Sequence, residues 1–145
     1  MTKLRLFIIA ALAFAGTALA HTGVKNEAVK ARMNGMSAIG NEMKILGDMA
    51  KGATQFDPAL ARAAAAAIAD HAAATPDLFE AAEDDPHSEA KEVIWSDFEA
   101  FTAISARLNK TALDLSDTLE TEDDLRTGLQ VLGNACKDCH SVYRE

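Results

Sequence analysis

Two cysteines, and the histidine that follows the second, constrain this chain more than any other feature. Cys136 and Cys139 are the only cysteines among 145 residues, and His140 comes directly after them. The spacing Cys-x-x-Cys-His is the pattern by which a haem is attached covalently to a polypeptide. The two sulfurs bond the two vinyl groups of the porphyrin, and the imidazole faces the iron as an axial ligand. The rest of the chain is therefore expected to fold as an envelope for one haem c.

Other uses of two cysteines fit the sequence less well. A structural zinc site needs four ligands at short spacing, whereas His21, His71 and His87 stand singly. A thioredoxin-like pair opens a helix after a strand, but this motif ends a helical stretch. A disulfide between the two positions would be strained within a helix.

The first twenty residues have the order of a secretory signal peptide. Lys3 and Arg5 precede an apolar run over 6–15, and small residues lead up to Ala20. The apolar run is well short of the ~20 residues that span a bilayer. We therefore predict a signal peptide over 1–20, cleaved after Ala20, and one mature domain over 21–145. Export points to the periplasm, where attachment of haem through this motif also takes place in bacteria.

The composition is strongly acidic. The chain has 14 Lys and Arg against 22 Asp and Glu, a net charge of −8, and loss of Lys3 and Arg5 with the signal peptide takes it to −10. Such a surface repels nucleic acid and anionic membranes, so we expect neither as a partner. It favours a partner with a basic surface, although it serves solubility equally well.

The mature chain contains four helical stretches and no strand-like segment. The first has apolar residues near helical and heptad spacing from Val29 to Ala50 and ends at Gly52. The second runs from Asp57-Pro58 to Thr75-Pro76, the third starts near Ser88, and the fourth opens at Thr121 with a run that resembles a capping box. These elements predict an all-α, left-handed, up-down-up-down four-helix bundle.

The bundle topology predicts where the site lies. The end of the fourth helix, with His140, should lie beside the beginning of the first. A group that meets the other side of the iron should therefore come from residues 29–43 or from the end of the second helix. The alanine-rich second helix is expected only to pack.

Several segments together resemble one protein family over essentially the whole mature chain. They are Arg32 with Met36, Lys51-Gly52, Leu78-Phe79, Ile94-Trp95, and the run from Gly133 to Arg144. The chain in these segments resembles the cytochrome c′ family, the class II c-type cytochromes. Members of this family are often homodimers through their first two helices, and the alanine-rich faces here permit that contact.

The resemblance implies a role for each site residue. Haem c is attached at Cys136 and Cys139, His140 is the proximal ligand, and Arg144 flanks it. Arg32 pairs with a haem propionate through its two parallel donors. The remaining haem-pocket residues are expected to be Met33, Gly40, Trp95 and Phe98.

Met36 decides between two functions. In most of the family an apolar residue here blocks the sixth site of the iron, and such members bind nitric oxide or carbon monoxide. In a low-spin branch a methionine coordinates, which raises the potential and suits electron transfer. Gly35 and Gly40 beside Met36 favour ligation if a flat ring approaches the helix, although methionine is also a common core residue. His71 is an alternative ligand.

The expected function is therefore that of a soluble periplasmic mono-haem cytochrome, not membrane-spanning, which carries single electrons through a haem ligated by His140 and Met36. The alternative is a gas-binding cytochrome c′ in which Met36 blocks the sixth site without ligating. An enzyme is not expected, because no nucleophile–base set appears. Asp84-Asp85 and Asp123-Asp124 are interpreted as solvated charge and helix-start acids. The expected partners are redox proteins with a basic docking surface.

Overall fold

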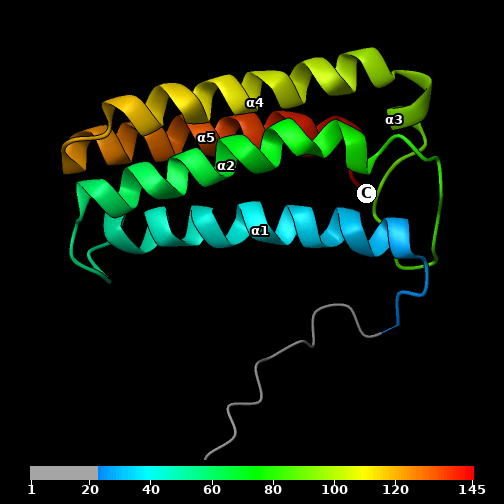
Figure 1. Ribbon diagram of the computed structural model, residues 1–145, viewed down its shortest axis with the longest axis horizontal. Helices are drawn as coiled ribbons and strands as arrows, with labels where there is room; N and C mark the ends of the chain where they lie inside the picture. Colours follow the sequence, from blue (N-terminus) through cyan, green and yellow to red (C-terminus); the bar gives the residue numbers. More distant parts are fainter. Residues whose placement is uncertain (1–22) are drawn as a thin grey trace, which may run out of the picture.

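The computed structural model describes residues 23–145, and they form a bundle of four long helices that run alternately up and down (Figure 1). The helices are α1 (Glu27–Ala50), α2 (Pro58–Leu78), the short α3 (Val93–Ser96), α4 (Phe98–Thr118) and α5 (Glu122–Tyr143). The predicted all-α four-helix bundle is thus confirmed. The predicted signal peptide, residues 1–20, lies outside the described residues. None of the described helices is long and apolar enough to cross a membrane.

Side-chain caps explain where three of the long helices begin. The side chain of Asn26 accepts from the amide of Val29 at 3.0 Å at the start of α1. Asp57 caps α2 ahead of Pro58, as the sequence predicts. Thr121 and Asp124 form a reciprocal capping box at the start of α5. Each cap satisfies backbone donors that have no partner within the helix.

Helix α2 ends two residues later than predicted. The sequence predicts an end at Thr75-Pro76, but the helix continues through Pro76 to Leu78. Proline has no amide hydrogen, so it cannot donate to the carbonyl of Ala72 four residues earlier. The hydroxyl of Ser105 in α4 donates to that carbonyl at 2.7 Å instead. A partner helix therefore supplies the hydrogen bond that the proline removes.

The predicted start of the third helix near Ser88 is also wrong. The chain stays irregular until α3, breaks at Asp97, and begins its third long helix only at Phe98. The reason is tertiary, because the segment around Ala90 pairs with the end of the chain. Ala90 and Arg144 form an isolated antiparallel bridge.

The bundle has a long core and a smaller aromatic cluster at one end. The long core includes Leu46, Leu125 and Leu132, and it is lined by buried alanines of α2. Those alanines confirm that the second helix is a packing element. The end cluster consists of Phe79, Ile94, Phe101 and Tyr143. Met36 packs against both groups and so marks the boundary between them.

Candidate functional site

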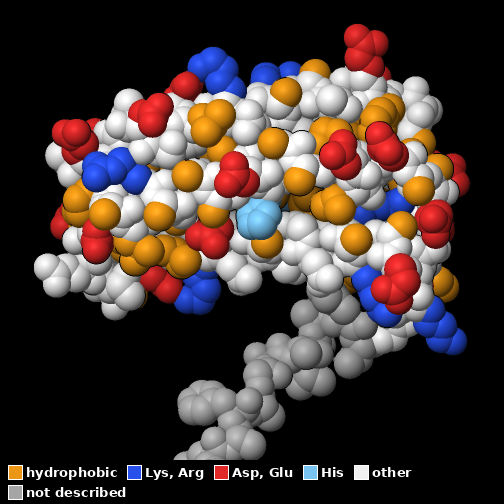
Figure 2. All heavy atoms as spheres, viewed as in Figure 1, with side chains coloured by type: hydrophobic (Ala, Val, Ile, Leu, Met, Phe, Trp, Pro, Cys, Tyr) orange, Lys and Arg blue, Asp and Glu red, His pale blue; other side chains and the backbone are white. Residues whose placement is uncertain are grey.

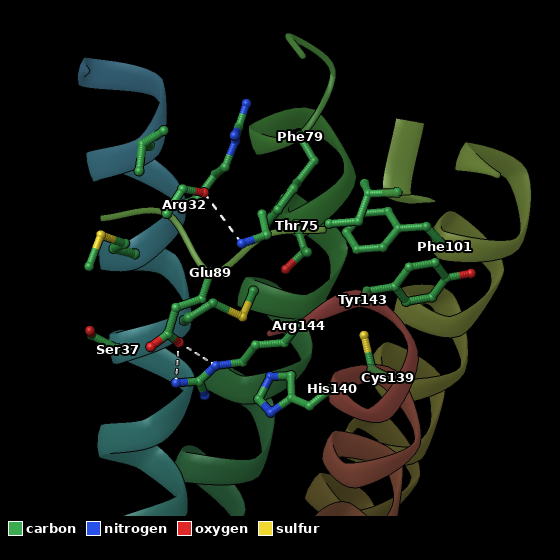
Figure 3. A pocket seen from close by; sticks show the side chains of 16 residues that line it. Arg32, Ser37, Thr75, Phe79, Glu89, Phe101, Cys139, His140, Tyr143 and Arg144 are labelled. Carbon is green, nitrogen blue, oxygen red and sulfur yellow. Dashed lines mark hydrogen bonds and ion pairs between the residues drawn. The ribbon is translucent and has the colours of Figure 1, made fainter. Parts of the chain in front are cut away.

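A cavity of about 320 Å³ lies at the end of the bundle where α1 begins and where α2 and α5 end. We call it the end cavity. Its volume is within the range of roughly 300–1,000 Å³ that is usual for small-molecule and cofactor sites. Its walls come from the first half of α1, the end of α2, the α2–α3 loop, α3, the start of α4 and the last turn of α5 (Figure 3). This is the place that the topology of the predicted bundle indicates.

The last turns of α5 bring the cysteine motif to the end cavity. Cys139, His140 and Tyr143 line the cavity, and Cys136 lies one turn earlier on the same helix. Both thiols are free and partly buried. Burial raises the pKa of each thiol above its usual value, so both are protonated at neutral pH.

His140 stands on the open side of the end cavity. Its imidazole is exposed, yet desolvation by the surrounding protein lowers its pKa. The positive charge of Arg144 lowers that pKa further, while the negative charge of Glu89 acts in the opposite direction. The imidazole is therefore neutral at neutral pH, which is the form that binds a metal.

The first helix contributes two methionines to the lining of the end cavity. Met33, Met36 and Ser37 line the end cavity from successive turns of α1, within the predicted segment 29–43. Met36 is partly buried between the two apolar clusters. Thr75 and Phe79 from the end of α2 complete this side. The cavity thus brings together Met36 and His140, the two residues that the sequence singles out as axial ligands.

Arg32 is buried, with 3% of its surface exposed, and it binds backbone carbonyls. Its Nε donates to Leu78 at 3.0 Å, Nη1 donates to Glu83 at 2.7 Å, and Nη2 donates to Ala81. Desolvation lowers its pKa. A guanidinium has five N–H donors, and at least three of them hold the chain after α2. The sequence predicts a propionate partner for Arg32 and contains no signal for these carbonyls.

Aromatic rings hold Arg32 and form the cavity wall. The guanidinium carbon lies 5.1 Å from the ring centre of Phe79 and 5.0 Å from that of Trp95. The indole nitrogen of Trp95 donates to the carbonyl of Phe79 at 2.8 Å. The ring centres of Phe79 and Phe101, which lie next to each other in the wall, are 5.0 Å apart. Trp95 and Phe98 stand behind this wall, since neither is among the residues that line the end cavity.

The glycines beside Met36 do not share one environment. A Cβ on Gly35 would approach Leu78 Cδ1 to 2.7 Å, so this glycine permits close contact between α1 and α2. Gly40 has no atom within 4 Å of the position of a Cβ, and it does not line the end cavity. Close packing of helices accounts for Gly35 without a ring beside it.

The segment 88–90, where the sequence predicts the start of the third helix, supplies the remaining wall. Ser88, Glu89 and Ala90 line the end cavity together with Arg144. Arg144 Nε donates to Glu89 Oε2 at 2.5 Å. Within the described part of the chain, Glu89 supplies the only carboxylate that lines the end cavity.

Two other histidines belong to the described part of the chain, and neither lines the end cavity. His71 of α2 and His87 are not among its lining residues. The Nδ1 of His87 lies 3.0 Å from Asp85 Oδ1. Asp85 corrects the interpretation of Asp84-Asp85 as solvated charge, because it is 7% exposed and accepts from the amides of Lys25, at 2.9 Å, and Asn26, at 3.2 Å.

Two lining residues differ in how readily the sequence could have revealed them. Tyr143 follows His140 by three residues and Cys139 by four, which is helical spacing on one face, so the periodicity of α5 contains the signal. Glu89 reaches the cavity through a loop that pairs with the end of the chain. No local pattern predicts that pairing.

The residues present fit a covalently attached haem. Two unpaired thiols at Cys-x-x-Cys spacing and a neutral imidazole meet an apolar cavity, which is the donor set that such a group requires. Residues 23–145 contain no cluster of three or more His, Cys, Asp or Glu side chains that could hold a bare metal ion. The fold and the site define a class of protein, the four-helix-bundle c-type cytochromes.

Comparison with known proteins agrees with this class. The family model for cytochrome C′ matches residues 27–144. The chain is 35% identical to cytochrome c′ of Rhodospirillum rubrum over 144 residues, covering 97% of each protein. It is 34% identical to cytochrome c-556 of Agrobacterium fabrum over 117 residues, covering 80% of each. The structure of cytochrome c′ from Rhodopseudomonas palustris superposes with a TM-score of 0.77 at 28% identity, covering 83% of this chain and 98% of that one.

The chain belongs to the cytochrome c′ family. The cofactor of this family is covalent haem c, and Cys136 and Cys139 are present in this chain to attach it. An oxidised cytochrome c556 of R. palustris also superposes, with a TM-score of 0.76 at 25% identity, covering 83% of this chain and 98% of that one. The relatives thus carry both names, cytochrome c′ and cytochrome c556.

Proposed function

We propose that this protein is an electron carrier in which His140 and Met36 ligate the iron of one haem c. The observation that carries the proposal is that both side chains line one cavity, Met36 from α1 and His140 from α5. Met36 also packs between two apolar clusters, which restricts its movement. When bound, the haem supplies a one-electron couple, and ligation by methionine and histidine favours a high reduction potential.

The protein side chains have separate tasks in this proposal. Cys136 and Cys139 hold the haem by thioether bonds, and His140 supplies the proximal nitrogen. Phe79 and Tyr143 exclude water from the end cavity. Arg32 fixes the chain after α2 through its bonds to carbonyls, and its remaining donors are available for a propionate.

The remaining predicted pocket residues take supporting places. Met33 lines the cavity one turn before Met36, while Trp95 and Phe98 support the aromatic wall from behind. Gly40 lies on the same face of α1 as Met36, one turn further along the helix. Arg144 flanks His140 at the open side of the cavity.

We further propose export to the periplasm and transfer of electrons to proteins with a basic docking surface. The order of residues 1–20 supports export, and the net charge of −8 supports a basic partner. Asp and Glu side chains are spread over the face in Figure 2, among fewer Lys and Arg. An intact mass that begins at His21 and includes one haem would test both the cleavage and the attachment.

Carbon monoxide binding tests the ligation. In the wild-type ferrous protein the thioether should exclude carbon monoxide, so binding should be slow and weak. Met36→Leu keeps the packing volume, which costs less than about 1.5 kcal/mol, but it removes the sulfur and should bind carbon monoxide readily. The matched control is Met33→Leu, one turn away on the same cavity wall, which should behave as wild type.

Rapid carbon monoxide binding by the wild type, unchanged in Met36→Leu, would contradict the proposal. It would support the alternative function, a gas-binding cytochrome in which Met36 blocks the sixth site without ligating the iron.

A further inference from the structure

The charged groups around the end cavity are unequal in number. Its lining includes two arginines and one carboxylate, that of Glu89, within the described chain. Arg32 is buried and is held by backbone carbonyls. Arg144 lies at the open side, where 51% of its side chain is exposed, and Glu89 is the acidic group beside it. The charge next to His140 is therefore set by one ion pair.

Backbone pairing holds Glu89 in this position. The amide of Glu145 donates to the carbonyl of Glu89 at 2.9 Å, and the amide of Lys91 donates to the carbonyl of Tyr143 at 3.0 Å. Ala90 and Arg144 face each other between these two hydrogen bonds. The loop is thereby fastened to the last turn of α5, which also carries His140. The carboxylate is placed by the backbone as well as by its ion pair.

The side-chain contact is concentrated on one oxygen. Arg144 Nε and Nη2 both point at Glu89 Oε2, as the two dashed lines in Figure 3 show. The imidazole of His140 lies on the same wall. Glu89, Arg144 and His140 all line the end cavity, and Figure 3 shows the three labelled side chains on the same side of it.

We propose that Glu89 tunes the reduction potential by cancelling the charge of Arg144 beside His140. The inference rests on the proposed function, since it requires a haem iron bound to His140. Ferric haem gains one electron to become ferrous and loses one positive charge. A positive charge nearby therefore favours the ferrous form and raises the potential, while a negative charge lowers it.

The test is the reduction potential of the purified holo-protein, measured in a mediated spectroelectrochemical titration. Glu89→Gln keeps the shape of the side chain and an acceptor for Arg144 but removes the charge, so the potential should shift upward. Glu92→Gln removes the same charge from an exposed position in the same loop, outside the cavity lining, and should shift it much less. Adding Arg144→Gln to Glu89→Gln should reverse most of the shift.

Two further measurements distinguish a charge effect from a change in the structure of the site. The shift should shrink as ionic strength rises, because 58% of the Glu89 side chain is exposed and its field is screened. The absorption spectrum and the hydrogen exchange of the Lys91 and Glu145 amides should stay as in the wild type. An unchanged potential, an equal shift in Glu92→Gln, or a shift with an altered spectrum would overturn the inference. A wild-type protein that carries no haem would instead defeat the proposed function.

Discussion

At the scale of single residues, the most informative contact is the hydroxyl of Ser105 on the carbonyl of Ala72. Pro76 leaves this buried carbonyl without its helical donor, and Ser105 replaces the missing hydrogen bond at 2.7 Å. The helical residues after Pro76 include Leu78, whose carbonyl accepts a hydrogen bond from Arg32 Nε. One hydroxyl in α4 thus supports the wall of the end cavity.

Ser105→Ala should lower the free energy of unfolding by about 1–3 kcal/mol, because it leaves a buried acceptor unsatisfied. Ser116→Ala is the matched control in the same helix. Its hydroxyl donates to the carbonyl of Leu113. That carbonyl can still accept the ordinary helical hydrogen bond from the amide four residues later, so the loss of stability should be much smaller. Chemical denaturation of both variants gives the comparison. Equal losses would contradict the role assigned to Ser105.

Arg32 shows what sequence can and cannot predict at this scale. Its place on the inner face of α1 follows from helical spacing with Met36. Its partners are carbonyls of Leu78, Ala81 and Glu83, and a carbonyl is the same in every residue. The sequence therefore predicted that Arg32 belongs to the site but not what it binds there.

At the scale of elements, Asp85 joins the α2–α3 loop to the start of α1. Hydrogen bonds from the amides of His87, Lys25 and Asn26 lower its pKa strongly. Because its folded-state pKa lies below the unfolded value of about 3.9, the carboxylate stabilises the fold at neutral pH. That contribution is lost as the pH falls below about 4.

Asp85→Asn should therefore be less stable than the wild type at neutral pH, and the difference should shrink as the pH falls from about 5 toward 2. Thermal unfolding followed by circular dichroism across this range measures it. Asp84→Asn, the exposed neighbour, should show no such convergence with the wild type. A gap for Asp85→Asn that stays constant with pH would mean that the carboxylate charge is not what holds the loop.

Two helical glycines differ in whether a neighbouring helix leaves room for a Cβ, and they can be compared directly. A Cβ on Gly128 of α5 would lie 2.8 Å from Leu115 Cδ2 and 3.3 Å from its Cδ1. A Cβ on Gly47 of α1 would meet only Lys51 Nζ, at 3.9 Å.

Gly47→Ala should stabilise the fold by about 0.5–1 kcal/mol through helix propensity. Gly128→Ala should gain less than that, because the Leu115 side chain must move to make room for the new Cβ. Urea denaturation curves of the two variants test the difference. Similar stabilisation of both would show that α4 and α5 do not approach as closely as described.

Local signals predicted the elements that local chemistry determines. The apolar faces of the long helices are visible in sequence, and so are the caps at Asp57 and Thr121 that begin two of them. The late start of the third long helix is different, since Ala90 pairs with Arg144 from the far end of the chain. Ser88 comes two residues after Pro86 and resembles a helix start until that distant partner is known.

At the scale of the whole molecule, the order and direction of the helices determine where the site lies. An up-down-up-down bundle brings the first half of α1 and the end of α5 to one end (Figure 1). Residues 29–43 could therefore be predicted to face His140. The charge balance at the open side of the cavity could not be predicted in this way, because Glu89 lies in a loop that has no helical periodicity.

The central claim is that Met36 and His140 together hold the haem iron. The most direct measurement is the electron paramagnetic resonance spectrum of the ferric wild-type protein at neutral pH. Two strong axial ligands give a low-spin signal, and we expect this signal to dominate the spectrum. A dominant high-spin signal would contradict ligation by Met36.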